Sequence, residues 1–198
     1  MGRKATTKIR SNDVLKKKHW VSGLILKIQE RDISNLTIDE LSLMMSKSKS
    51  TVYEYFQSKD EVIELAVEVH LDNLRIYPVL LKNDHPDPVQ QYREFLMLMC
   101  KGAHGIKASF LEDLKLVYPK AWSRISQFLL QVISDQKNFY LNGMKRGVFQ
   151  EVSATLLSQL DYHFVFDIMA NSKLYQDETM EQMVQDYLHV KFEGLVIS

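Results

Sequence analysis

Residues 37–61, TIDELSLMMSKSKSTVYEYFQSKDE, carry three helix-start signals in close succession. Thr37 and Glu40 have the spacing of a capping box, in which the hydroxyl accepts a hydrogen bond from an orphan amide and the carboxylate reaches back to the cap residue. Ser58 begins a second box with the same spacing, and Ser48 between them is a further N-cap candidate. Starts this close together predict a very short helix, a tight turn, another short helix and then a long one.

That order of elements is typical of a helix-turn-helix, whose second short helix enters the major groove of DNA. Lys49, Ser50 and Thr51 fall on the first turn of this second helix, where side chains can reach base edges. The segment therefore predicts a DNA-binding element in the N-terminal part of the chain.

The charge distribution supports a polyanionic partner, although the net charge of the chain is zero. Residues 1–60 carry twelve Lys and Arg against seven Asp and Glu, a net of +5, and residues 61–198 carry thirteen against eighteen, a net of −5. A basic segment joined to an acidic one is the asymmetry expected of a nucleic-acid-binding domain with a second domain attached. Ordinary scatter of solubilising charges is the alternative explanation.

The composition indicates a helical protein with a substantial core. Of the 198 residues, 45% are hydrophobic and 10% aromatic, whereas only seven are Gly and four are Pro. The lone Cys100 excludes an internal disulfide and suits a reducing compartment. The sequence contains no run of 18 apolar residues and no apolar signal core at its start, so a cytoplasmic protein without a membrane span is expected.

Apolar residues recur at helical spacing along the chain and predict an all-α fold of about nine helices. Their boundaries follow from cap residues, glycines and prolines. Pro78, for example, is expected to stop the fourth helix near Tyr77, because proline disfavours the α region in the residue before it. The expected helices span about 13–31, 38–45, 49–56, 59–77, 88–103, 107–117, 120–146, 153–172 and 177–196.

The helix-turn-helix segment resembles the N-terminal domain of the TetR family of bacterial transcriptional regulators. About 50 residues carry the resemblance, and VYEYFQSKDE at 52–61 is its most diagnostic part. It implies a DNA-binding domain at residues 1–60, with the helix that begins near Lys59 as connector, and an effector-binding and dimerisation domain at residues 61–198. The matching positions are Thr37, Leu41, Ser42, Met45, Ser46, Lys47, Ser48, Val52, Tyr53, Tyr55, Phe56, Lys59 and Val62.

Three departures from the family pattern fall in this segment. Met45 and Ser46 replace the usual Ala-Gly of the turn; if the second position needs a positive φ, serine there costs up to about 1 kcal/mol relative to glycine. Lys47 replaces an apolar residue, so its side chain either snorkels or becomes an extra DNA contact. Glu54 would be repelled by phosphate and is assigned no DNA contact.

The resemblance places the DNA contacts on and beside the two short helices. Tyr53 and Tyr55 lie at the far end of the second one, where phenol hydroxyls suit phosphate oxygens; packing against the first helix of the chain is the alternative role for either. Thr37 and Lys59 stand at helix N-termini, where the helix dipole favours an anion. The expected DNA-binding residues are Thr37, Lys47, Ser48, Lys49, Ser50, Thr51, Tyr53, Tyr55 and Lys59.

The C-terminal part resembles the same family more weakly. Residues 141–157, LNGMKRGVFQEVSATLL, are similar to the bend where a long helix ends and the penultimate helix begins. The resemblance implies that the last two helices pair with a symmetry mate in a four-helix bundle. A homodimer would present two DNA-binding helices to adjacent major grooves of a palindromic operator.

The resemblance also implies a small-molecule effector bound among the helices of residues 61–198. Nothing concentrates positive charge there, so the expected effector is small and apolar and a polyanion is disfavoured. Methionine and aromatic residues at helical spacing also fit an ordinary core. The candidate lining residues are Met97, Cys100, His104, Phe110, Trp122, Phe128, Tyr140, Tyr162 and Phe166.

No catalytic or cofactor motif accompanies these features. Cys100 with His104, and His163 with Asp167, are spaced as half of a metal site, but two ligands are weak grounds for one. We therefore expect a ligand-responsive dimeric repressor with no enzymatic activity, cofactor or metal. A helical interaction protein of the same fold without sequence-specific DNA binding is the alternative, and a small α-helical enzyme is the third hypothesis.

Overall fold

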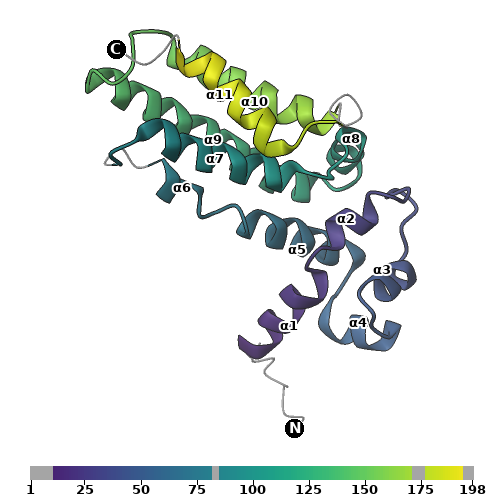
Figure 1. Cartoon of the computed structure of the whole chain (residues 1–198). Coiled ribbons are helices and arrows are strands. Elements are labelled where there is room, and N and C mark those ends of the chain that lie inside the picture. Colours follow the sequence, from purple (N-terminus) through teal and green to yellow (C-terminus); the bar gives the residue numbers. More distant parts are fainter. Residues whose placement is uncertain (1–10, 82–84, 171–176, 194–198) are drawn as a thin grey trace.

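The computed structural model describes residues 11–81, 85–170 and 177–193, and all regular elements in these ranges are helices (Figure 1). The all-α prediction is confirmed. In chain order the elements are α1 (Ser11–Val21), α2 (Leu24–Ile28), α3 (Ile38–Met44), α4 (Lys49–Tyr55), α5 (Lys59–Asp72), α6 (Tyr77–Leu80), α7 (Pro88–Ala103), α8 (Ala108–Val117), α9 (Pro119–Lys145), α10 (Ala154–Ala170) and α11 (Met180–Glu193).

Each of the nine expected helices is present, and two of them are interrupted. The first is divided into α1 and α2 at Gly23, whose φ of 70° lies in the left-handed region. The fourth ends at Asp72, five residues before the expected stop, and Tyr77 begins the one-turn α6 with Pro78 in its first turn, where a missing amide proton is tolerated. The expected helix ends at 172 and 196 lie outside the described residues.

Helices α1 to α4, together with the first half of α5, form the small N-terminal unit in the lower part of Figure 1, here called the head. Its core contains Ile28 from α2, Leu41 from α3, Val52 from α4 and Ile63 from α5, all fully buried. Helix α5 contacts α1 and α2 on one side and α9 on the other. The head is therefore joined to the rest of the chain through α5, and Phe110 and Leu114 of the later helix Ala108–Val117 pack into the same core.

Helices α7, α9, α10 and α11 lie alongside one another in the upper part of Figure 1 and form, with α6 and α8, the body. Their core is rich in aromatic rings, among them Tyr92, Phe95, Phe139 and Phe149, which pack with centroid separations of 5.0 to 5.7 Å. Such large rings bury much apolar area per residue and stabilise the packing of α7 on α9.

A buried carboxylate lies at the centre of the body. Asp161 on α10 is fully buried and accepts four hydrogen bonds from three other helices. Its Oδ2 accepts from the hydroxyls of Tyr92 at 2.5 Å and Tyr140 at 2.7 Å. Its Oδ1 accepts from the Tyr187 hydroxyl at 2.9 Å and from the Lys191 ammonium at 2.5 Å.

The charges of this cluster are balanced inside the core. Burial raises the pKa of Tyr92 and Tyr140 well above the usual value, and the Asp161 charge raises the pKa of both further. Burial lowers the pKa of the Lys191 ammonium, and the ion pair with Asp161 opposes that shift. Gln136 completes the cluster by donating to the Tyr92 hydroxyl at 2.9 Å. An isolated buried charge would be costly, so the members stabilise one another.

We expect Lys191→Met to lower the free energy of unfolding by about 3–5 kcal/mol, because it leaves the Asp161 carboxylate buried without its counter-charge. Urea denaturation at one fixed protein concentration measures the loss. Adding Asp161→Asn to Lys191→Met should restore part of the stability, and Lys137→Met on the exposed surface of α9 is the matched control. A loss below about 1 kcal/mol for Lys191→Met would contradict a buried ion pair.

Candidate nucleic-acid interface and effector cavity

The helix starts of the head are fixed by their own side chains. Thr37 Oγ1 accepts from the Glu40 amide at 3.2 Å, and Glu40 Oε2 accepts from the Thr37 amide at 2.9 Å, which confirms the predicted capping box. Ser58 Oγ accepts from the Glu61 amide at 3.2 Å, as predicted. The Glu61 carboxylate, however, accepts from the amide of Gln57 rather than that of Ser58, at 2.8 Å. Both caps hold the start of a helix without help from distant residues.

The turn between α3 and α4 depends on one residue in the left-handed region. Ser46 has a φ of 56°, a value that no other described non-glycine residue shares. The turn closes through hydrogen bonds from the Ser46 amide to the Leu43 carbonyl and from the Lys47 amide to the Ser42 carbonyl, at 3.0 and 2.9 Å. The position thus needs the positive φ that glycine adopts without strain, and serine occupies it at a cost.

Helix α4 has a buried face and a polar exposed face. Ser48 Oγ accepts from the Thr51 amide at 3.1 Å, which confirms the predicted N-cap. Val52 and Phe56 are buried in the head core, as predicted. On the other face Lys49, Ser50, Tyr53 and Glu54 are exposed, and Tyr53 is 55% accessible. The helix can therefore present these polar side chains to a partner without unfolding.

Lys49 is engaged within the head. Its ammonium forms an ion pair with Asp39 of α3, with an Nζ–Oδ1 distance of 2.8 Å, and the hydrogen bond raises the pKa of Lys49. Both side chains are more than half exposed. Exposed pairs of this kind contribute little to stability and are exchanged readily for another anion.

Two other residues expected to contact DNA, Lys47 and Tyr55, pack against Trp20 of α1. The Lys47 ammonium lies 5.1 Å from the centroid of the indole ring, so this lysine packs its stem across α1. Tyr55 is half-buried and meets Trp20 edge-on with centroids 4.7 Å apart, which fits the packing role considered for it. Lys59, at the start of α5, donates to the Leu36 carbonyl at 3.1 Å.

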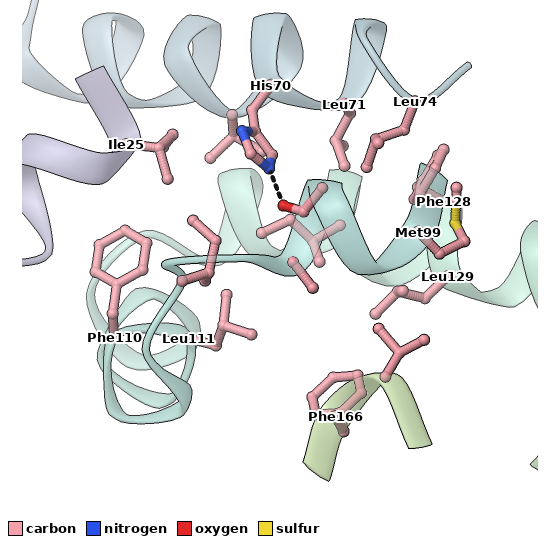
Figure 2. A pocket seen from close by; sticks show the side chains of 16 residues that line it. Ile25, His70, Leu71, Leu74, Met99, Phe110, Leu111, Phe128, Leu129 and Phe166 are labelled. Atoms are coloured by element: carbon pink, nitrogen blue, oxygen red, sulfur yellow. Dashed lines mark hydrogen bonds between the residues drawn. The ribbon is translucent and has the colours of Figure 1, made fainter. Parts of the chain in front are cut away.

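An apolar cavity of about 120 Å³ lies where the head meets the body (Figure 2). Helices α2, α5, α7, α8, α9 and α10 contribute to its wall, and Phe110, Phe128 and Phe166 of the expected lining are among its residues. His70 of α5 lies in the wall with its Nε2 donating to the Gly102 carbonyl oxygen at 2.9 Å, so its polar atom is already paired. A ligand in this space would meet almost only carbon.

The other six expected lining residues lie outside this wall. Tyr140 belongs to the buried cluster around Asp161, and Cys100 lies near that carboxylate. His104 is exposed at the C-terminal end of α7, and the Tyr162 ring packs at a tilt against Phe166 with centroids 4.4 Å apart. The remaining two are the half-buried Met97 and Trp122.

Helix α5 supplies cavity residues that were absent from the expected set. Val67, His70 and Leu71 line the space from this helix, and Leu74 lines it from just beyond the end of the helix. Their spacing of i, i+3, i+4 and i+7 is the signal that could have identified them. The same spacing is typical of any core-facing stripe, so it indicates the face without indicating the cavity.

The two residue pairs with metal-ligand spacing do not form larger groups. In the described ranges, no three His, Cys, Asp or Glu side chains come together as a metal site would require. Burial raises the pKa of the Cys100 thiol to about 12, and Asp161 adds to the shift. The thiol is therefore protonated at neutral pH and is a poor ligand and nucleophile. Among the same residues, no helix combines the length and apolar composition needed to cross a bilayer.

Comparison of the sequence with known proteins finds one partial relative. No model of a known protein family matches the chain. The uncharacterised HTH-type transcriptional regulator YvaF of Bacillus subtilis (strain 168) is 24% identical over 96 residues, which make up 48% of this chain and 50% of that protein. The match thus spans about half the length of the curated relative.

Comparison of the structure finds similarity over nearly the whole chain. PfmR, a TetR family transcriptional regulator from Thermus thermophilus, superposes with a TM-score of 0.66 and 16% identity, over 98% of this chain and 100% of that chain. AibR, in its complex with isovaleryl coenzyme A and operator DNA, gives a TM-score of 0.65 and 13% identity over 90% of this chain and 97% of that one. At these identities the likeness is one of fold.

We expect Ser46→Gly to stabilise the protein by up to about 1 kcal/mol, because glycine adopts a positive φ without strain. The gain is limited because glycine also increases the conformational entropy of the unfolded chain. The midpoint of thermal unfolding, measured with and without the substitution, checks this. Ser34→Gly, at an exposed loop position outside the left-handed region, should not stabilise. A destabilised Ser46→Gly would contradict the left-handed turn.

Proposed function

We propose that this chain, which has the fold of the TetR-family transcriptional regulators, is a ligand-responsive repressor that binds a palindromic operator as a homodimer. Residues 1–60 would bind DNA, with α5 as connector, and residues 61–198 would bind the effector and form the dimer. The main support for the proposal is the exposed polar face of α4. The opposite face of this helix is buried in the head core, and its start is capped by Ser48. A helix displayed in this way is suited to a major groove.

The geometry of the head supports different contacts for its polar residues. Lys49, Ser50 and Thr51 on the first turn of α4 would approach base edges, and Lys49 would leave Asp39 to do so. Thr37, Tyr53 and Lys59 border one shallow hollow between the starts of α3 and α5, a suitable place for a phosphate. Phosphate contacts of this kind fix the register of a protein on the duplex.

The outer surfaces of the last two helices support homodimerisation. Leu156 and Leu160 of α10 are 58% and 45% exposed, and Val190 of α11 is 76% exposed. Beside them Phe164 stacks on Tyr187 with centroids 4.0 Å apart. Large apolar side chains exposed on both helices are expected to be covered by another surface, and a second copy that presents the same helices would form a two-fold bundle.

The cavity supports a small uncharged effector. Its volume of about 120 Å³ is comparable to the roughly 150 Å³ of an engineered apolar cavity that stays dry and binds benzene. AibR was solved with isovaleryl coenzyme A, but the charged part of such a molecule would find no polar partner in this wall. A ligand that fills the space would act by favouring one of two arrangements of head and body.

A second function, a helical interaction protein without sequence-specific DNA binding, is favoured by two observations. Glu54 is exposed on the same helix as Lys49, and Lys49 is paired with Asp39, so the face of α4 carries less free positive charge than its lysine suggests. Binding to DNA separates the two functions.

We expect the protein to bind the DNA upstream of its own coding sequence, most tightly at ~50 mM salt, where phosphate contacts are strongest. Lys49→Ala should weaken binding about 5- to 100-fold if the lysine contacts a base edge, and Tyr53→Phe should weaken it less because one phosphate contact is lost. Fluorescence anisotropy measures both.

Lys137→Ala on the exposed face of α9 is the matched control for this measurement. Absence of binding at ~50 mM salt would overturn the repressor and leave the interaction protein.

We expect benzene or toluene to raise the unfolding temperature of the protein, because a ligand that binds only the folded state stabilises it by mass action. Val165→Phe, which fills the cavity from α10, should remove this response. Leu130→Phe on the exposed face of α9 should keep it. An equal response in all three proteins would place the hydrocarbons elsewhere.

A further inference from the structure

We propose that Gln29 is the positioning residue that couples the cavity to the helix-turn-helix, through the loop between α7 and α8. The inference rests on the proposed function for its biological meaning. It adds a specific route of regulation: a change in the cavity wall reaches the DNA-binding turn through one side-chain amide.

Gln29 holds the α7–α8 loop from both ends of its amide. Its Nε2 donates to the carbonyl oxygen of Gly105, and its Oε1 accepts from the amide of Lys107 at 2.8 Å. Lys107 also forms an ion pair with Glu30, the next residue of the head, with an Nζ–Oε2 distance of 2.7 Å. A side chain that both donates and accepts fixes the position of the loop backbone relative to the end of α2.

The held loop is also a wall of the cavity. Gly102 and Ala103 at the end of α7, and Ile106 in the loop, line the space, and Ile106 is buried. Gly105 between them has a φ of 76°, so the backbone turns sharply where Gln29 grips it. Ile25, one helical turn before Gln29, lines the same cavity from the head (Figure 2). A ligand would thus press on both partners of the Gln29 contact.

Helix α2 is connected in turn to the helix-turn-helix. Lys27 donates from its Nζ to the carbonyl oxygen of Met44 at 2.9 Å, and Met44 is the last residue of α3 before the left-handed turn. Leu24 and Ile28 on the same short helix are buried in the head core, so α2 moves with that core. The hydrogen bonds of Gln29 and of Lys27, with α2 between them, form a continuous path from the cavity wall to the turn.

Gln29 is expected to contribute little to the stability of the fold. Its hydrogen bonds are exposed to solvent, and such bonds contribute little to stability because water replaces them. Their geometry still favours one placement of the loop over others. Replacing the amide should therefore uncouple the two regions while leaving each folded.

Hydrogen exchange of the full-length protein tests the coupling without DNA and without a known effector. Ile106→Ala alters the cavity wall, and we expect it to raise amide exchange of the turn residues Ser46 and Lys47 by roughly 5-fold or more, the lower end of usual coupling factors. When Ile106→Ala is introduced into the Gln29→Met protein, amide exchange of Ser46 and Lys47 should rise by less than about 2-fold. Ile106→Val replaces Ile106→Ala if the latter does not fold.

Two further variants distinguish the effect of the Gln29 hydrogen bonds from the effect of changing a side chain to methionine. Gln29→Glu keeps the acceptor for Lys107 but cannot donate to Gly105. In this background Ile106→Ala should raise exchange of the turn amides less than it does in the wild type. An increase as large as in the wild type would overturn the role of the donated bond. Gln150→Met, at an exposed position away from the loop, is the matched control and should transmit fully. Equal transmission in wild type and Gln29→Met, or none in either, would overturn the inference.

A DNA-binding measurement tests whether the coupling through Gln29 affects regulation. Operator affinity is measured with and without toluene, and the ratio of the two dissociation constants should approach one in Gln29→Met while each protein still binds DNA. If no variant binds DNA, the repressor proposal fails, whereas the exchange experiment still decides the coupling. If the ratio is unchanged by Gln29→Met, the amide does not carry regulation.

Discussion

The packing of α5 against helices of both the head and the body is the constraint on which the arrangement of the molecule depends. Val62 and Ile63 near its start are buried in the head, and Leu71 near its end lines the cavity where the head meets the body. The helix is continuous from Lys59 to Asp72 and contacts α1, α2 and α9. The two groups of helices therefore meet along one element, which makes the join between them a natural place for control.

The local part of the fold could be predicted because it depends on neighbours in sequence. The caps at Thr37, Ser48 and Ser58 satisfy amides three residues away, so the residues that make the bond are visible in the sequence. The break at Gly23 and the early end of α5 at Asp72 could not be predicted in this way. A lone glycine is tolerated inside a helical pattern, so periodicity could not distinguish a break at Gly23 from a continuous helix, and no glycine or proline stands at Asp72 to mark the end of α5.

The candidate site could be predicted only in part. The exposed face of α4 follows from the positions of Val52 and Phe56, whose burial turns the polar residues outward. The cavity could not be predicted, because it is a space left unfilled between the side chains of six helices. Of the residues that line it, only Phe110, Phe128 and Phe166 were in the expected set. The burial of Asp161 was not anticipated at all, since its partners come from three other helices and acidic residues are usually exposed.

That buried carboxylate has a consequence for how this sequence can change over generations. Loss of Lys191 alone, or of a tyrosine around Asp161, leaves an unmatched polar group in the core, whereas joint replacement by apolar side chains of similar volume is tolerated. Descendants of this chain should therefore keep the whole cluster or lose it together. The two structures compared above share only 16% and 13% of their residues with this chain, so retention of the whole cluster would identify a near relative more clearly than any single residue.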